Sequence, residues 1–383
     1  MGRAKRQSGA GRFRQIEQFV RDYTAGLRQE DVKRLFDRDA AQTYAVLARD
    51  QADRPEPSGR LRRFFHRART VFLGLSYKLS PPRRLLFAFA LLAGLLGVAG
   101  NRFTIAGSGG VHLEADASGF WYLASLLSLV YLLAMELVDR VLVRDELEVA
   151  RGVQRQLLPA GEVEIPGWSV AHGYRTANEV GGDYYDFLPV AGGRLAVVAG
   201  DASGHGMAAG LVMALASAAI HTAIELDPAP PSVARAVNRV VLRTGGARAF
   251  MSLFYGLLDP ATGELEYLGA GHPFPLLRRA SGEIAELGRG GLPLGVRAGL
   301  DLATESVRIA PGDLLVLYSD GLPEGLGSDG EAFGFERLRS LARDRGSAAE
   351  VHRRILAAFD LRRRAEEALA DDLTLVVLER HPA

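Results

Sequence analysis

The sequence predicts an α+β domain of short strands and separate helices, preceded by a helical region with two long apolar runs. Three observations support this. After Pro159, short β-type runs are joined by turn sequences such as Asp259 to Gly263 and Pro311 to Asp313. Helical patterns fall in blocks of their own, and the two apolar runs interpreted as possible membrane spans both lie before residue 139. Hairpin turns favour antiparallel pairing, and segregated strands and helices favour a layered α+β domain.

The length and composition of the chain exclude several classes of protein. A chain of 383 residues is expected to form more than one structural unit, and its formal net charge of +1 does not indicate a nucleic-acid partner. All lysines lie before residue 79, at Lys5, Lys33 and Lys78. Residues 79–383 therefore lack the lysine that an ordinary kinase, P-loop ATPase or Schiff-base enzyme needs. The absence of cysteine excludes thiolate catalysis, disulfides and cysteine-bound zinc.

The N-terminal part contains no recognisable chemistry. Residues 1–59 are predicted to be a helical region and linker, with Pro55 and Pro57 near its end. A segment rich in arginine follows, for which a solvated basic face is the simplest interpretation. Residues 60–140 are predicted to comprise this basic segment and a two-helix membrane hairpin.

The two apolar runs are Leu85–Gly100 and Phe120–Val138. Each is slightly shorter than the roughly 20 residues of a spanning helix. The first expected helix is therefore extended to 85–106, and the second, which begins with aromatic residues, is expected at 120–138. Membrane spans are favoured, and buried core helices are the alternative. Arginines before residue 85 outnumber the basic residues between the runs, so the positive-inside rule places both chain ends in the cytoplasm. The predicted location is the inner (cytoplasmic) membrane, with the C-terminal domain in the cytoplasm.

Residues 135–158 are predicted to form a linker helix that ends at Pro159. Residues recur on one side at intervals of four, three, four and three, and all but Gln154 are apolar or small: Val143, Leu147, Ala150, Gln154 and Leu157. This two-heptad pattern predicts a homodimer, although a helix that packs on its own domain shows the same pattern.

Beyond Pro159, the regular elements follow from periodicity and turn residues. Strands are expected near residues 194–200, 250–258, 264–269, 304–309, 314–319 and 373–378. Helices are expected near residues 207–226, 232–243 and 348–369.

Four acidic positions lie where these strands begin or end: Asp183, Asp201, Asp320 and Asp371. A single aspartate beside glycine is most simply a turn residue. Several carboxylates brought together would repel one another, and a multivalent cation would compensate for this. Oxygen ligands select hard ions, so the sequence predicts Mn²⁺ or Mg²⁺ with waters completing the shell.

The motifs around these residues resemble the metal-dependent protein phosphatase (PPM) superfamily, and within it the bacterial SpoIIE-type, sigma-regulating serine phosphatases. The motifs are Gly-Gly-Asp-Tyr-Tyr-Asp at 181–186, Gly-Asp-Ala-Ser-Gly-His-Gly at 200–206, Ala-Gly-His-Pro at 270–273 and Ser-Asp-Gly at 319–321. Residues 154–159 are similar to the entry into that domain. The region that these motifs mark covers about 60% of the chain.

The resemblance implies a β-sandwich flanked by helices over residues 159–380, with two metal ions at one edge. It implies that Asp201 bridges both ions, that the carbonyl of Ala202 and the carboxylate of Asp183 assist one ion, and that Asp320 and Asp371 complete the other. The implied reaction is hydrolysis of phosphoserine or phosphothreonine on a regulatory protein, with an anti-anti-sigma (STAS) domain as the substrate class. Two ions can activate water for in-line attack, so no covalent intermediate is needed.

Several alternatives remain open from the sequence. His205 or His272 is a candidate general acid, but either can instead be an orienting or packing group. The chain has Gly269 to His272 where many superfamily members have an aspartate for a third ion, so the sequence does not decide whether a third ion binds. One rival interpretation is a catalytically silent PPM-fold binding protein, which would lack a metal aspartate. Another is a two-metal nucleotide cyclase, which would need a purine-reading element such as a lysine.

Overall fold

The computed structural model describes residues 59–100, 102–106, 112–244, 249–363 and 369–382. The chain divides into two compact units, Met1–Arg140 and Val141–Ala383, which are described separately. The helical region predicted over residues 1–59 lies outside the described residues except for Gly59.

The first unit contains helices and one β-hairpin. Its helices are α4 (Arg60–Lys78), α5 (Pro81–Ala99) and α6 (Ser118–Gln156), the last of which continues into the second unit. Strands β1 (Arg102–Ala106) and β2 (His112–Asp116) pair antiparallel. The expected helix through residue 106 is not formed, because Gly100 has φ 68° and ends α5, so Phe103 and Ile105 lie in β1.

Helices α5 and α6 pack closely through small residues. Ala90 and Ala93 are buried, and the Tyr122 ring lies so near Gly97 that a Cβ there would be 2.9 Å from it. The hydroxyl of Ser125 donates a hydrogen bond of 2.8 Å to the carbonyl of Ala90. Small residues and a hydroxyl-to-backbone bond at the contact are typical of helices that associate in a membrane.

The outer sides of this helix pair are apolar. Exposed large side chains include Leu85, Leu92, Leu95 and Val98 on α5 and Phe120, Leu126, Val130 and Leu133 on α6. Among the described residues, two helices meet a length-and-composition test for crossing a membrane: α5, of which little is buried, and α7 (Met207–Leu226), which is half buried in the second unit. We therefore treat α7 as a core helix, and α5 and the first half of α6 as the candidate membrane spans.

The second unit is built on two antiparallel five-stranded sheets. The strand order in the first sheet is β10-β7-β6-β5-β4, and in the second it is β3-β12-β11-β8-β9. The first sheet consists of β4 (Asp183–Val190), β5 (Arg194–Ala202), β6 (Met251–Leu258), β7 (Glu264–Ala270) and β10 (Glu305–Arg308). The second consists of β3 (Trp168–Arg175), β8 (Leu276–Arg278), β9 (Ile284–Glu286), β11 (Leu314–Tyr318) and β12 (Leu373–Arg380).

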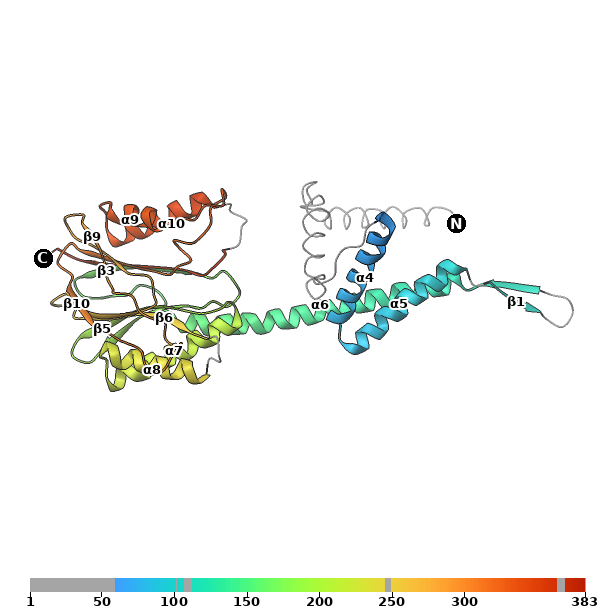
Figure 1. Ribbon diagram of the computed structural model, residues 1–383, viewed down its shortest axis with the longest axis horizontal. Coiled ribbons are helices and arrows are strands. Elements are labelled where there is room, and N and C mark those ends of the chain that lie inside the picture. Colours follow the sequence, from blue (N-terminus) through green and yellow to red (C-terminus); the bar gives the residue numbers. More distant parts are fainter. Residues whose placement is uncertain (1–58, 101, 107–111, 245–248, 364–368, 383) are drawn as a thin grey trace, which may run out of the picture. The chain divides into compact units, whose positions relative to one another are not determined.

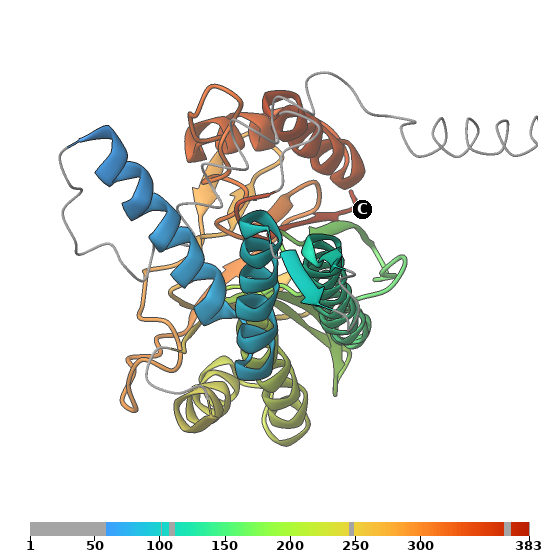
Figure 2. The ribbon, with the colours of Figure 1, turned by 90° about the vertical axis from the view of Figure 1, so that its right-hand side faces the viewer.

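Helices cover the outer faces of both sheets, giving four layers (Figures 1 and 2). Helices α7 and α8 (Pro230–Thr244) pack on the first sheet, and α9 (Phe335–Arg343) and α10 (Ala348–Arg362) pack on the second. One buried cluster fills the space between the sheets and under α7 and α8, and another lies under α9 and α10. The predicted sandwich flanked by helices is confirmed.

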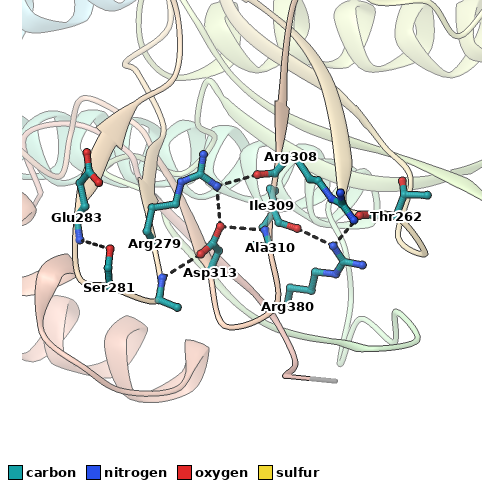
Figure 3. Close-up of polar contacts among 10 residues, drawn as sticks. Thr262, Arg279, Ser281, Glu283, Arg308, Ile309, Ala310, Asp313 and Arg380 are labelled. Carbon is teal, nitrogen blue, oxygen red and sulfur yellow. Dashed lines mark hydrogen bonds and ion pairs between the residues drawn. The ribbon is translucent and has the colours of Figure 1, made fainter.

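A polar cluster ties the sheets together at the end where β6 turns into β7 (Figure 3). The buried carboxylate of Asp313 accepts hydrogen bonds from the Arg279 guanidinium at 2.7 Å and from the backbone N–H groups of Ala280 and Ala310 at 2.9 Å. Arg380 donates to the carbonyls of Thr262 and Ile309, both at 2.7 Å. Because β5 and β6 are antiparallel, Asp201, opposite Ser252, lies at the other end of the sandwich.

Candidate active site

Strand ends from both sheets bring the predicted acidic residues together. Asp183 begins β4 and stands directly opposite Asp201, near the end of β5. Directly opposed residues in antiparallel strands have Cβ atoms about 4.5–5.5 Å apart and share one face of the sheet. From the second sheet, Asp320 follows β11 and Asp371 precedes β12. The structure thus gathers all four aspartates at one end of the sandwich, between the sheets.

Burial and mutual repulsion act on the central pair. The pKa of Asp183 is raised to about 8, first by burial and also by the charges of Asp372 and Asp320, while hydrogen bonds from Thr374 and Ser319 lower it. The pKa of Asp201 is raised to about 9, first by burial and then by neighbouring charges, of which those of Asp183 and Asp320 contribute most. Both carboxylates therefore resist ionisation unless a cation compensates.

Asp320 and Asp371 complete the cluster differently. The Oδ1 atom of Asp320 is buried and has no hydrogen-bond partner among the described residues. Burial, followed by the charge of Asp371, raises the pKa of Asp320. Asp371 itself is exposed, and its Oδ1 atom accepts a 2.8 Å hydrogen bond from the backbone N–H of Asp372. A buried carboxylate oxygen without a donor is a group that a cation would satisfy.

The residues fit Mn²⁺ or Mg²⁺ by donor chemistry. Within the described ranges, no three His, Asp or Glu side chains are grouped closely enough to hold one ion between them. Magnesium, however, commonly binds through one or two carboxylates and keeps several waters. Such an ion would bind best beside Asp183, Asp201 and Asp320. The pKa values of Asp183 and Asp201 are raised, and a buried oxygen of Asp320 has no hydrogen-bond donor among the described residues.

The backbone around the pair is closely packed. A Cβ on Gly182 would lie 2.6 Å from the carbonyl oxygen of Ala202 and 3.0 Å from Oδ1 of Asp201. Only glycine therefore lets the Asp183 loop approach Ala202, whose N–H donates a 3.1 Å hydrogen bond to the carbonyl of Gly182. This brings the Ala202 carbonyl beside the carboxylates, as the family resemblance implies for a ligand.

Asp372 positions the loop that carries Asp183. Its two carboxylate oxygens accept hydrogen bonds from the backbone N–H groups of Ala177 at 2.8 Å and Gly182 at 2.6 Å. Asp186 does not take part in this support. It lies an odd number of residues from Asp183, and its Oδ2 atom contacts the Tyr184 hydroxyl at 2.8 Å and His221 of α7 at 3.1 Å instead.

Sequence reasoning missed the structural role of Gln154. This buried side chain lies in the last turn of α6, accepts a 3.0 Å hydrogen bond from the N–H of Gly181 and donates one of 2.6 Å to the carbonyl of Gly181. Gly181 lies two residues before Asp183, so the end of α6 is joined to the carboxylate loop. The sequence did contain a sign of this role, because Gln154 is the polar residue in a series of apolar or small residues on one side of the helix.

Thr374 and Ser319 were also missed as contacts. The hydroxyl of Thr374 donates a 2.6 Å hydrogen bond to Oδ2 of Asp183, and the N–H of Thr374 donates to Oγ of Ser319 at 2.9 Å. These bonds link Asp183 of the first sheet to β11 and β12 of the second. No periodicity in the sequence predicts contacts across 191 residues.

The two candidate histidines differ in environment. His205 is exposed in the short loop between β5 and α7. His272 is buried; its Nδ1 atom lies 3.0 Å from Oγ of Ser252, the residue opposite Asp201, and burial lowers its pKa to about 3. Burial thus disfavours the cationic form of His272 that a proton donor needs, and exposed His205 is the better-placed candidate.

Comparison with known proteins agrees with this arrangement. The profile of the Stage II sporulation protein E (SpoIIE) family matches residues 191–381. This match spans about half of the chain and supports the SpoIIE-type branch of the PPM superfamily that the motifs predict. The matched region contains Asp201, Asp320 and Asp371, whereas Asp183 lies just before it.

Relatives include phosphatases by name. Phosphoserine phosphatase RsbU of Bacillus subtilis (strain 168) is 28% identical over 243 residues, which cover 62% of this chain and 71% of RsbU. Protein IcfG of Synechocystis sp. (strain ATCC 27184 / PCC 6803 / Kazusa) is 26% identical over 54% of this chain. The chain spans only 37% of the length of IcfG.

A solved structure supports the fold. The SiaA-PP2C domain of Pseudomonas aeruginosa superposes with a TM-score of 0.55 at 24% identity, covering 64% of this chain and 99% of that domain. The PPM-type sandwich predicted from the motifs is therefore the observed fold.

Proposed function

We propose that this protein is a metal-dependent phosphatase that hydrolyses phosphoserine or phosphothreonine on a regulatory protein. The observation that carries this proposal is the carboxylate cluster of Asp183, Asp201, Asp320 and Asp371 at one end of the sandwich, in a chain related to a named phosphoserine phosphatase. All four aspartates are present, which argues against a silent binding protein.

Each residue has a distinct part in the proposal. Asp201 would hold one Mn²⁺ or Mg²⁺ ion together with Asp183 and the Ala202 carbonyl, and a second ion together with Asp320 and Asp371. Ions bound here would supply an activated water and positive charge for the phosphoryl oxygens. Thr374 and Asp372 hold Asp183 and its loop in position, and Gly182 leaves room for the Ala202 carbonyl. His205, exposed on the neighbouring loop, is the candidate donor of a proton to the leaving oxygen.

The proposed substrate class is a phosphorylated STAS domain. This rests on the resemblance to sigma-regulating phosphatases and on the similarity to RsbU. The test is phosphate release from a serine-phosphorylated STAS domain and from a phosphoserine peptide of unrelated sequence, with Mn²⁺ or with chelator. Hydrolysis of both substrates at equal kcat/KM would support the phosphatase activity but reject the STAS domain as the preferred substrate.

The proposed location and assembly follow from the first unit. The α5–α6 hairpin spans the inner (cytoplasmic) membrane with the phosphatase domain in the cytoplasm, and two chains associate through α6. Leu157 is not part of that interface, because it packs against the phosphatase core. Gln154 is not part of it either, because its side chain is hydrogen-bonded to Gly181. The proposed seam is therefore limited to Val143, Leu147 and Ala150.

A further inference from the structure

Helix α4 has arginines on one side and large apolar side chains on another. Arg62, Arg63 and Arg69 are exposed. Leu61, Phe72 and Leu75 are also exposed, by 74%, 40% and 42% of their surfaces. Intervals of eleven and three residues separate these apolar positions, so they share one face of the helix. A purely solvated basic helix would not need this apolar face.

Contacts fix α4 at the beginning of α5. Only Leu79 and Ser80 separate the two helices. The Arg84 guanidinium donates hydrogen bonds to the carbonyl of Leu79 at 2.8 Å and to that of Tyr77 at 3.0 Å. Phe72 stacks on Phe87 with ring centroids 5.8 Å apart. The end of α4 is therefore held at the first turns of α5 (Figure 1).

Charged residues mark where the apolar part of the hairpin ends. Arg83 of α5 forms ion pairs with Glu136 at 3.3 Å and with Asp139, both on α6. No charged residue occurs in residues 85–99 or 118–135. If the hairpin spans a bilayer, these ion pairs lie at the boundary of its hydrocarbon region, and the attached end of α4 lies at the same level.

We propose that α4 lies in the headgroup region of an anionic leaflet, with Leu61, Phe72 and Leu75 directed towards the acyl chains and its arginines on lipid phosphates. An amphipathic helix with a basic polar face binds this region by apolar burial together with attraction to anionic lipids. The planar guanidinium suits phosphate oxygens in particular. The proposal rests on the membrane hairpin and is independent of the catalytic chemistry.

The chain has no cysteine, so a single introduced cysteine can carry an environment-sensitive fluorophore such as NBD. Full-length protein would be labelled at Leu75→Cys on the apolar face, Arg69→Cys on the basic face, or Leu92→Cys on α5. The labelled proteins would be placed in nanodiscs of phosphatidylcholine alone or mixed with phosphatidylglycerol. We expect a blue shift and a several-fold intensity rise for Leu75→Cys in anionic discs only. The Arg69→Cys label should stay in a water-like environment, and adding R62Q and R63Q should abolish the Leu75→Cys response.

Three results would overturn the proposal. Equal Leu75→Cys emission in neutral and anionic discs would remove the anionic-lipid requirement. A Leu75→Cys label already shielded in detergent without lipid would show that protein covers this face. A water-exposed Leu92→Cys label would reject the hairpin and α4 binding together, and phosphatase activity of the same discs would show whether the catalytic proposal survives.

Discussion

At the scale of single residues, Asp201 is the carboxylate on which the proposed chemistry most depends, because four other aspartates, which come from strand ends of both sheets, act on it. We expect Asp201→Asn and Asp320→Asn each to lower kcat by more than about 100-fold, since a metal centre contributes several kcal/mol to the transition state. Both variants should fold, because each removes charge and little volume. Phosphate release with Mn²⁺ and circular dichroism measure the two outcomes.

Asp259→Asn is the matched control for these variants, because Asp259 lies in the β6–β7 turn at the other end of the sandwich and accepts backbone hydrogen bonds there. It should lower stability slightly and leave kcat unchanged. Near-wild-type turnover by Asp201→Asn with normal metal content would contradict the assignment of Asp201.

The raised pKa values of Asp183 and Asp201 also predict how stability depends on pH. Both values, about 8 and about 9, exceed the unfolded value of about 3.9. The folded state binds the extra protons, so the contribution of each group to the unfolding free energy is fully present below about pH 4 and is lost as pH rises through the folded pKa. The test compares the urea concentrations at which wild type and Asp201→Asn are half unfolded, both in the presence of chelator. The wild-type value minus the Asp201→Asn value should decrease as the pH rises from about 5 to about 9. A flat difference would show that Asp201 is ionised without metal.

At the scale of secondary-structure elements, the end of α6 is joined to the carboxylate loop by one side chain. Gln154→Ala would leave the buried N–H and C=O of Gly181 without partners, at a cost of about 1–3 kcal/mol of stability. We also expect a higher Mn²⁺ concentration for half-maximal activity, because Gly181 lies two residues before Asp183. Gln156→Ala, exposed at the end of the same helix, is the control and should change neither quantity. An unchanged metal requirement in Gln154→Ala would limit Gln154 to packing.

The proposed dimer depends on the middle of α6. Leu147→Asp should shift full-length protein from dimer to monomer in sedimentation, because it places a charge in the seam with Val143 and Ala150. Val149 is 69% exposed and lies outside that seam, so Val149→Asp is the matched control. Dissociation by both variants, or by neither, would reject this seam.

Much of the second unit could be predicted from the sequence, because the apolar periodicity and turn residues of each segment indicate its helix or strand. Helix α7 has the expected bounds, and β5, β6, β7, β11 and β12 agree within a few residues. The turn Ser281–Glu283 indicated β-type runs on both sides, but the three-residue strands β8 and β9 were not given bounds. They are too short to show a pattern of their own: β8 pairs with β11, and β9 pairs with β8. Helix α10 ends at Arg362, seven residues before the expected end.

In the candidate site, too, the sequence predicted the residues with local signals and missed the contacts that depend on the fold. The four aspartates could be singled out because each lies at the beginning or end of a strand and matches a family motif. Their supporting contacts could not, because Gln154, Thr374 and Asp372 reach the Asp183 loop from distant parts of the chain. The role of Leu157 was likewise hidden, since an apolar residue in a helical seam serves a partner helix and its own domain equally well.

At the scale of the whole molecule, the two units have opposite surfaces. In the first unit, α5 and the first half of α6 expose leucine, valine and phenylalanine side chains around a contact of small residues. In the second, the apolar side chains fill two cores inside a four-layered domain. A soluble protein would leave the first set in water at a cost of about 25 cal/mol per Å² of apolar surface, which insertion in a bilayer avoids.

This contrast predicts how the protein partitions. Full-length protein should stay in the membrane fraction after a carbonate wash, whereas a truncated protein beginning at Arg151 should be soluble and keep the catalytic domain with Gln154 in place. Replacing Leu92 and Leu126 by aspartate in the full-length chain should weaken membrane retention, because each side chain is more than half exposed and would face the acyl chains. Release of the folded full-length protein by carbonate would mean that other protein, and not lipid, covers these side chains.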